Sequence, residues 1–260
     1  MERLVVTLGV AALVTITLLI LLQIPPKTIL AQNFNSYVIN MAKNTQRMAH
    51  FDAQYKKSDL AGRPYIRFEA INGKLMGDSL KQYVSPKVYM GLEMYDRTKT
   101  RIGDSHLTPG MIGCYLSHYA VYENIRDSGV PYAIIFEDDA TIDPLIYKKN
   151  VKSIVEEDGT FPLDWDIILL GHICKKCKEA TPNYTVPKYF WGLHGYMISQ
   201  KGVETMLKNQ EPAISMQIDH YMSELSQNGL LDIYAIHPSL VNQKNFGTDL
   251  QMPIRALSRV

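Results

Sequence analysis

The sequence predicts an α/β fold in which a mostly parallel sheet carries helices on both faces. Short apolar runs alternate along the chain with amphipathic, helix-like stretches, and this order is typical of such folds. A length of 260 residues with 46% hydrophobic content suits one good-sized domain, and no shift in composition divides it. A charge-free apolar stretch precedes that region. We therefore expect a membrane anchor and linker over residues 1–32 and one domain over residues 33–260.

The amino-terminal segment is long enough to cross a bilayer. Residues 4–22 contain no charged side chain, and polar and proline residues follow at positions 23–27. A cleaved signal peptide usually has a shorter apolar core, of about 7–15 residues, and residues 29–31 match its cleavage site poorly. We expect residues 4–24 to form an uncleaved anchor in the membrane. The charge bias around it favours a single-pass type II protein with its domain in the lumen of the ER or Golgi.

The pattern of the body predicts its individual elements. Thr108 is a capping residue followed by proline at the first helical position, which indicates a helix over residues 109–127. A second amphipathic helix is expected over residues 45–57, and residues 83–105, the least patterned stretch, are expected to form a loop. Strands are expected at residues 37–39, 65–70, 132–136, 166–170, 196–199 and 232–236.

Charge and cysteine content exclude some classes of partner. The formal net charge of +1 and the scattered Lys and Arg residues give no basic surface for a nucleic acid. Three cysteines do not make a disulfide framework. Cys174 and Cys177 form a lone CxxC pair, for which a local disulfide or two free thiols are favoured over a zinc site.

Three consecutive carboxylates follow the expected strand at residues 132–136. They belong to Glu137, Asp138 and Asp139, and adjacent carboxylates repel one another unless solvent or a cation relieves them. Most short acidic runs are solvated loops, which is one interpretation. The other is a metal site, because carboxylates at a strand end of an open α/β sheet suit Mg²⁺ or Mn²⁺ carrying a diphosphate. The expected helix adds a polar face, since Cys114, Ser117 and His118 fall at helical spacing, although spacing alone favours a helix–sheet contact.

Several motifs occur together in a defined order. They are YVIN at residues 37–40 with Arg47, FEAING at 68–73, LTPGMIGCYLSH at 107–118, FEDD at 136–139, HGYMIS at 194–199 and HPSLVNQ at 237–243. In this order and spacing the chain resembles the family 25 glycosyltransferases, which include lipooligosaccharide galactosyltransferases and the collagen hydroxylysine galactosyltransferases. The resemblance covers residues 36–243, nearly all of the expected domain.

The resemblance implies a GT-A-like nucleotide-diphospho-sugar transferase domain that inverts at the sugar carbon and uses a divalent cation. Glu137, Asp138 and Asp139 are then expected to hold Mn²⁺ or Mg²⁺ against the diphosphate of a UDP-sugar. The implied reaction moves a hexose, with galactose or glucose favoured, to a hydroxyl of a glycan or protein acceptor. The run at residues 41–44 departs from the acidic, arginine-rich run usual in the family.

The resemblance also implies roles for five further residues. Asn40 and Arg47 are expected to line the uridine or phosphate pocket, and Ser117 and His118 to support the diphosphate or the metal shell. His194 is expected near the acceptor. Structural roles remain open for each: Asn40 as a helix cap, Arg47 at the surface, and His194 in a turn.

Inversion in a single displacement needs a base opposite the departing UDP. Asp219 is our candidate, because it is acidic and lies in the carboxyl-terminal half, where acceptor loops of this fold gather. Helix capping is the structural alternative for Asp219, and His220 is the alternative base. A catalytically inactive member of the family, acting in adhesion or binding, is the second functional hypothesis. The intact acidic run favours the enzyme.

Overall fold

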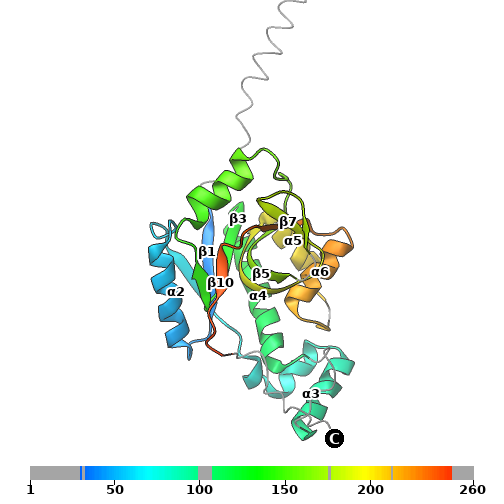
Figure 1. Cartoon of the computed structure of the whole chain (residues 1–260). Helices are drawn as coiled ribbons and strands as arrows, with labels where there is room; N and C mark the ends of the chain where they lie inside the picture. Colours follow the sequence, from blue (N-terminus) through cyan, green and yellow to red (C-terminus); the bar gives the residue numbers. More distant parts are fainter. Residues whose placement is uncertain (1–29, 31–32, 99–106, 175–176, 212, 248–260) are drawn as a thin grey trace, which may run out of the picture.

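A mixed eight-stranded sheet forms the centre of the computed structural model, which describes residue 30 and residues 33–98, 107–174, 177–211 and 213–247 (Figure 1). In sheet order its strands are β2 (Tyr65–Glu69), β1 (Asn35–Asn40), β3 (Tyr132–Glu137), β8 (Phe190–Ser199), β5 (Ile167–Cys174), β9 (Ile233–Ile236), β7 (Tyr184–Pro187) and β6 (Cys177–Glu179). A separate antiparallel pair joins β4 (Ala140–Ile142) to β10 (Val241–Gln243). All six strands expected from the sequence are present.

The expectation of a mostly parallel sheet is wrong. β1 is parallel to β2 and β3, and β9 is parallel to β5, but β8 runs antiparallel to both of its neighbours. The outer pairs β7–β9 and β6–β7 are antiparallel as well. A parallel pairing needs a long crossover, usually a helix, whereas the chain between β5 and β8 folds into the β6–β7 hairpin. The alternation of strand and helix is therefore interrupted in this part of the chain.

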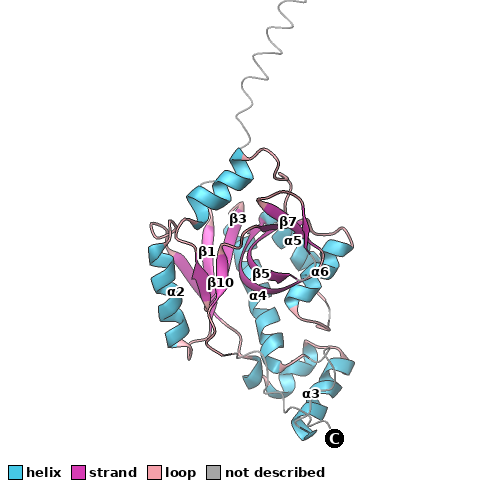
Figure 2. Cartoon of the chain, viewed as in Figure 1, coloured by secondary structure: helices cyan, strands magenta, loops and turns pink. Residues whose placement is uncertain are grey.

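Helices cover both faces of the sheet, as expected (Figure 2). The longer helices are α2 (Thr45–Lys57), α3 (Pro86–Thr98), α4 (Pro109–Ser128), α5 (Gln200–Lys208) and α6 (Ile218–Gln227). Shorter helical turns are η1 (Gly73–Leu75), η2 (Gly77–Gln82), η3 (Ile146–Val151) and η4 (Ser153–Glu157). The predicted anchor, residues 4–24, lies outside the described residues. None of the helices in the described ranges is long and apolar enough to cross a membrane.

The loop expected over residues 83–105 contains helix α3. Its start carries the same signal that identified α4, a hydroxyl residue followed by proline, and the Ser85 hydroxyl accepts a hydrogen bond from the Val88 amide. Val88 and Leu92 lie one turn apart, Leu92 within the buried apolar cluster that also contains residues of α4, and Val88 packed against that cluster. Residues 99–106 of the predicted loop lie outside the described residues.

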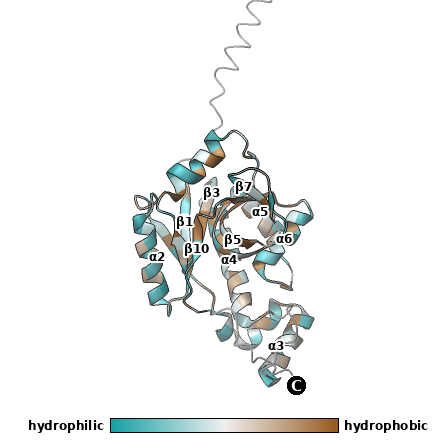
Figure 3. Ribbon diagram, in the orientation of Figure 1, coloured by the Kyte–Doolittle hydropathy of each residue, from teal (hydrophilic) through white to brown (hydrophobic). Residues whose placement is uncertain are grey.

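Alternate residues of the central strands supply two apolar layers. On one face Tyr37 and Ile135 pack with α3, α4, α5 and α6, and on the other Val38 and Phe136 pack with α2 and the turns η3 and η4. The central strands are accordingly apolar, while polar residues lie on the outer surface of α2 (Figure 3). This side-chain alternation fixes the register, because a slip of one residue exchanges the two layers.

The sheet order brings the predicted site residues to one edge. β1 and β3 are parallel neighbours, so their carboxyl ends lie side by side, with Ile39 paired to Glu137. β8 is antiparallel to β3, so its first half lies beside the same edge, with Gly195 paired to Phe136. Helix α4 begins nearby, where the Thr108 hydroxyl caps it by accepting a hydrogen bond from the Met111 amide.

A close backbone approach fixes the start of α4 against the turn η1. A Cβ atom at Gly113 would lie 2.4 Å from the Ile71 carbonyl oxygen and 2.6 Å from the Gly73 amide nitrogen. Ser117 reinforces the contact, because its hydroxyl donates to the Gly113 carbonyl at 2.6 Å and accepts from the Ile71 amide at 2.8 Å. Only glycine at position 113 permits this packing.

We expect Gly113→Ala to destabilise the domain, although alanine is the better helix former. The added methyl group must displace two backbone segments, and such overpacking costs about 1–3 kcal/mol. The melting temperature should fall by roughly 2–4 °C for each kcal/mol, measured by thermal unfolding. Gly62→Ala is the matched control, because a Cβ at Gly62 meets no atom within 4 Å. Equal melting temperatures for both variants would contradict this account of the α4–η1 contact.

Candidate functional site

A cavity of about 1010 Å³ opens at the carboxyl ends of β1 and β3. Its walls come from the start of α2, the start of α4, the acidic run after β3, the first half of β8 and the start of α6. The predicted site residues that line it are Arg47, Ser117, His118, Glu137, Asp138, Asp139, His194, Asp219 and His220. Asn40 is buried behind this wall, with 1% of its surface exposed. The fold thus assembles residues that are up to 173 positions apart, from Arg47 to His220, around one space.

Arg47 joins the two aspartates of the acidic run. Its Nε donates to Asp138 Oδ1 at 2.5 Å, and a terminal nitrogen donates to Asp139 Oδ2 at 2.7 Å. Burial lowers the pKa of Arg47, but the charges of Asp139 and Asp138 outweigh burial and leave that pKa above its ordinary value. The guanidinium therefore stays charged and compensates two carboxylates that are almost completely buried.

Asn40 forms the second side-chain hydrogen bond to Asp138. Its side-chain amide donates to Asp138 Oδ2 at 2.7 Å, while its oxygen accepts from Arg67 Nε at 2.9 Å. Both oxygens of Asp138 thus have partners within the protein. Asn40 does not cap α2 with its side chain, because the helix begins at Thr45 and its N-cap, Asn44, has no side-chain cap hydrogen bond. Asn40 therefore lies behind the cavity wall and holds Asp138, which lines the cavity, in place.

Asp139 keeps one oxygen without a partner. Its Oδ2 accepts from Arg47 and from Gln243 Nε2, the latter at 3.1 Å, whereas its buried Oδ1 has no hydrogen-bond partner among the described residues. Burial raises the pKa of Asp139, although Arg47 opposes that rise. A buried carboxylate oxygen with open lone pairs in a cavity wall is a position for a donor group or a cation.

Glu137 is the least constrained member of the acidic run. Within the described part of the chain its carboxylate has neither a hydrogen bond nor an ion pair, and it lines the cavity. Burial first, and then the charges of Asp139 and Asp138, raise the pKa of Glu137 to about 8. The ionised form of Glu137 is therefore destabilised until a cation or a donor approaches it.

Ser117 and His118 differ in what they offer to the cavity. The Ser117 hydroxyl is engaged with two backbone groups of the α4–η1 contact. His118 forms a hydrogen bond from Nδ1 to the Tyr196 hydroxyl at 2.7 Å, and its buried Nε2 has no partner among the described residues. Burial lowers the pKa of His118 to about 3, so the imidazole is neutral at physiological pH.

Asp219 connects α6 to β8 on the other side of the cavity. Its Oδ2 accepts from the Gly192 amide and its Oδ1 from the His220 amide, both at 2.8 Å. Gly192 has a φ of 76°, and a Cβ there would lie 2.6 Å from the His194 ring. Glycine at position 192 therefore lets the backbone turn its amide to Asp219 while the His194 ring packs against it. Burial lowers the pKa of His194, although the charge of Asp219 acts in the opposite direction.

Aromatic side chains line the cavity beside Asp219. Tyr189 lies 4.9 Å from both Trp191 and His220 between ring centroids, and Trp191 lies 6.0 Å from His220. No sequence pattern predicts that Tyr189, Trp191 and Gly192 lie near Asp219, because their proximity depends on the antiparallel course of β8. Gln243 is the last residue of the HPSLVNQ motif, and only the β4–β10 pairing brings it to Asp139.

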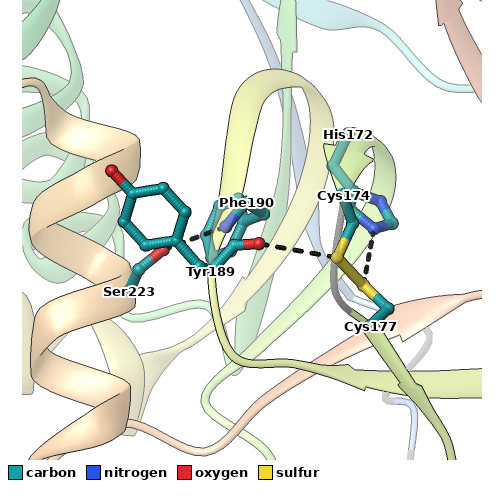
Figure 4. The surroundings of a disulfide bond; sticks show 6 residues. All are labelled: His172, Cys174, Cys177, Tyr189, Phe190 and Ser223. Carbon is teal, nitrogen blue, oxygen red and sulfur yellow. Dashed lines mark hydrogen bonds between the residues drawn. A yellow bond between two sulfur atoms is a disulfide. The ribbon is translucent and has the colours of Figure 1, made fainter. Parts of the chain in front are cut away.

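A disulfide between Cys174 and Cys177 closes the β5–β6 connection beside this aromatic group (Figure 4). The Cα atoms are 5.9 Å apart, and Cys174 Sγ lies 3.5 Å from the Tyr189 carbonyl oxygen. His172 Nε2 lies 3.8 Å from Cys177 Sγ. Of the two states left open by the sequence, the structure has the disulfide. The bond constrains the strand segment that contacts the backbone of Tyr189.

Comparison with known proteins finds a family and several distant relatives. The model of glycosyltransferase family 25 (LPS biosynthesis protein) matches residues 33–222. The probable inactive glycosyltransferase 25 family member 3 of Rattus norvegicus is 24% identical over 82% of this chain and 36% of its own length. Procollagen galactosyltransferase 1 of Danio rerio is 23% identical over 77% of this chain and 33% of its own length. The chain thus spans about a third of the length of these relatives.

Likeness to solved structures is weaker. The crystal structure of HddC from Yersinia pseudotuberculosis covers 72% of this chain and 84% of its own, at 13% identity and a TM-score of 0.29. A score at this level supports no argument about fold or function.

We expect Glu137→Gln to stabilise the metal-free protein at alkaline pH. The folded-state pKa of Glu137 lies above its ordinary value of 4.5, so the stability that this carboxyl contributes is present below that value and is lost as pH rises through the folded pKa. Glutamine cannot ionise and avoids that loss. With a chelator present, its melting temperature at pH 8 should exceed that of the wild type, by roughly 2–4 °C for each kcal/mol by which ionisation destabilises the folded state.

The difference between Glu137→Gln and the wild type should nearly disappear at pH 4, where the wild-type carboxyl is mostly protonated in both states. Glu204→Gln, a change at an exposed glutamate of α5, serves as the control and should leave the melting temperature unchanged at both pH values. A lower melting temperature for Glu137→Gln at pH 8 would mean that the ionised carboxylate stabilises the fold.

Proposed function

The chain belongs to glycosyltransferase family 25, and on that premise we propose that it transfers a hexose from a UDP-sugar to a hydroxyl of a glycan or protein acceptor. The observation that carries the proposal is one cavity with two chemically different sides. Asp139 and Glu137 present carboxylate oxygens at the end of β3 that no group in the described part of the chain pairs with, and Asp219 lies with aromatic side chains at the junction of β8 and α6. This division suits a charged donor on one side and a sugar or peptide acceptor on the other.

The size of the cavity supports a nucleotide sugar as the donor. A volume of about 1010 Å³ is at the upper end of ordinary ligand pockets. Ligands of α/β sheets bind outside the carboxyl ends of parallel strands, and this is the edge where β1 and β3 end. These features support the GT-A-like arrangement that the family resemblance implies, within a sheet that is mixed.

The donor atoms fit a hard divalent cation. Asp139 Oδ1 is a buried oxygen without a hydrogen-bond partner among the described residues, and the carboxylate of Glu137 forms no ion pair with any of them. Mn²⁺ and Mg²⁺ prefer carboxylate oxygens, so Asp139 and Glu137 are the proposed ligands, with Asp138 held behind them by Asn40 and Arg47. When bound, such a cation offsets the negative charge that develops on the departing UDP.

Asp219 is the proposed general base on the acceptor side. The amide of Gly192 and that of His220 fix both of its oxygens, so the carboxylate is oriented before an acceptor arrives. Each oxygen retains a second lone pair that can take the acceptor's hydroxyl proton. Trp191 and Tyr189 offer aromatic faces to the apolar side of a sugar ring or a peptide.

A non-catalytic binding protein is the second candidate, and one feature of the site favours it. The guanidinium of Arg47 pairs with Asp138 and Asp139, so a permanent positive charge already compensates these carboxylates without a metal ion. Some relatives are themselves named as inactive members of the family. Cation-dependent binding of UDP therefore distinguishes the two candidates.

The compartment and the membrane anchor remain part of the proposal. Disulfides persist in oxidising compartments, so the Cys174–Cys177 bond supports a domain in the lumen of the secretory pathway. Residues 4–24 are the proposed anchor, on the length and apolarity of that stretch.

We expect Asp139→Asn to abolish transfer and to weaken UDP binding in Mn²⁺ far more than in EDTA. The substitution keeps the size of the side chain and removes the charge that attracts the cation. Titration calorimetry with UDP, with and without chelator, measures the difference, and release of UDP from a panel of UDP-sugars measures turnover. Wild-type UDP affinity that is the same in Mn²⁺ and in EDTA would favour the non-catalytic candidate.

We expect Asp219→Asn to lower turnover by about 10²–10⁴-fold, the usual contribution of a general base. Donor binding should remain within about twofold, because Asp219 does not belong to the proposed cation site. The amide can replace only one of the two accepted hydrogen bonds, so thermal unfolding must accompany the assay. A structural role alone predicts a lower melting temperature and weaker UDP binding together. Near-normal turnover in Asp219→Asn with loss in His220→Ala would assign the base to His220.

A further inference from the structure

Three side chains with metal-binding atoms meet in the cavity where α4 passes the end of β3. One ligand atom from each of Cys114, His118 and Glu137 lies within 4.8 Å of the other two. Cys114 and His118 are one helical turn apart on the same face of α4, and Glu137 is the last residue of β3. The group combines a thiol, an imidazole and a carboxylate. It therefore differs in chemistry from the all-oxygen position at Asp139.

The orientation of His118 is fixed by hydrogen bonds remote from the cavity. The Tyr196 hydroxyl contacts Nδ1 at 2.7 Å, and the Tyr122 hydroxyl contacts that of Tyr196 at 2.7 Å. This network leaves Nε2 as the free ring nitrogen, in a side chain that is 99% buried and has no partner for that atom among the described residues. Metal-binding histidines commonly have a hydrogen bond of this kind on the second nitrogen, which holds the ring in place.

The other two ligands are also available. Cys114 is a free cysteine, and neither it nor Glu137 is engaged in an ion pair within the described residues. All three side chains line the cavity, so an ion from solvent can reach them and a water molecule can complete its coordination.

We propose that Cys114, His118 and Glu137 form a binding site for a divalent cation of the zinc type, which shares Glu137 with the Mn²⁺ or Mg²⁺ position at Asp139 and differs from it in its other ligands. Thiolate and imidazole ligands select Zn²⁺ over Mg²⁺ and Mn²⁺, which prefer carboxylates. On binding, the metal–sulfur bond replaces the S–H bond of Cys114, the metal–oxygen bond replaces the O–H bond of Glu137 where that carboxyl is protonated, and the protons leave to solvent. Three protein ligands and an open fourth position match the coordination of an accessible zinc site.

The proposed zinc site has one consequence for the active site, which rests on the proposed function. Glu137 belongs to both sets of ligands, so Zn²⁺ at Cys114 and His118 withdraws it from the cation at Asp139. Zn²⁺ is therefore expected to weaken Mn²⁺-supported UDP binding. The existence of the zinc site itself does not require transfer activity.

Cobalt titration of the full chain in detergent, without reductant, tests the site directly. Co²⁺ bound through a cysteine gives a thiolate-to-metal absorption band, which should appear in the wild type and disappear when Zn²⁺ is added. Cys114→Ser should remove the band. Tyr196→Phe, which frees the ring of His118, should weaken cobalt affinity by about 10–100-fold, the usual effect of losing a hydrogen bond to a ligand.

Two control variants separate this site from its neighbours. The double variant Cys174→Ser, Cys177→Ser must keep the band, because those residues and His172 are the other cysteine–histidine cluster of the described structure. Asp139→Asn must keep the band while losing Mn²⁺-dependent UDP binding. The cobalt result therefore stands even if the protein proves not to transfer a sugar.

Thermal unfolding establishes that each variant is folded. A wild type without the band, or a band that survives Cys114→Ser, overturns the proposal, and the wild-type titration decides even if that variant fails to fold.

Discussion

The ion pairs from Arg47 to Asp138 and Asp139 are the interaction on which the rest of the site depends. Two adjacent carboxylates are buried at the end of β3, and removal of one partner of such a buried pair typically costs about 3–5 kcal/mol. The pairs also join three elements, since Arg47 lies on α2, the aspartates follow β3, and Asn40 at the end of β1 bonds to Asp138. The geometry of the acidic wall is thus determined by the contact of α2 with the central strands, before any ligand binds.

The direction of β8 decides what faces this acidic wall. In a parallel arrangement its carboxyl end, at Ser199, would lie beside Glu137. In the antiparallel arrangement its first half lies there instead, and this half carries Trp191, Gly192 and His194. Asp219 is tied to the same strand through the Gly192 amide. A reversal of one strand therefore supplies the aromatic and acidic groups of the second wall, and the cavity gains two sides of different chemistry.

Local signals in the sequence predicted local structure well. Thr108 and Pro109 fixed the start of α4, and the six apolar runs became strands. The equivalent signal at Ser85 and Pro86 was overlooked in an otherwise unpatterned stretch. Strand direction between β5 and β8 depended on a hairpin whose short strands have little apolar pattern, so the parallel prediction was wrong.

Within the site, motifs identified the acidic run, Arg47 and Asp219, but hydrogen-bond partners depend on tertiary contacts. For that reason the sequence could not reveal that Asn40 and Arg47 would bind Asp138.

The pairing of β10 with β4 has a consequence for how the protein is made. Gln243 contacts the Asp139 carboxylate, and the Lys244 amide donates to the Asp139 carbonyl at 2.9 Å, although these residues follow Asp139 by more than a hundred positions in the chain. A ribosome synthesises the acidic run, α4 and β3 long before it reaches them. The cavity wall around Asp139 is therefore completed only when nearly the whole domain has emerged. In a chain that is still growing, Asp139 lacks its contacts with Gln243 and Lys244.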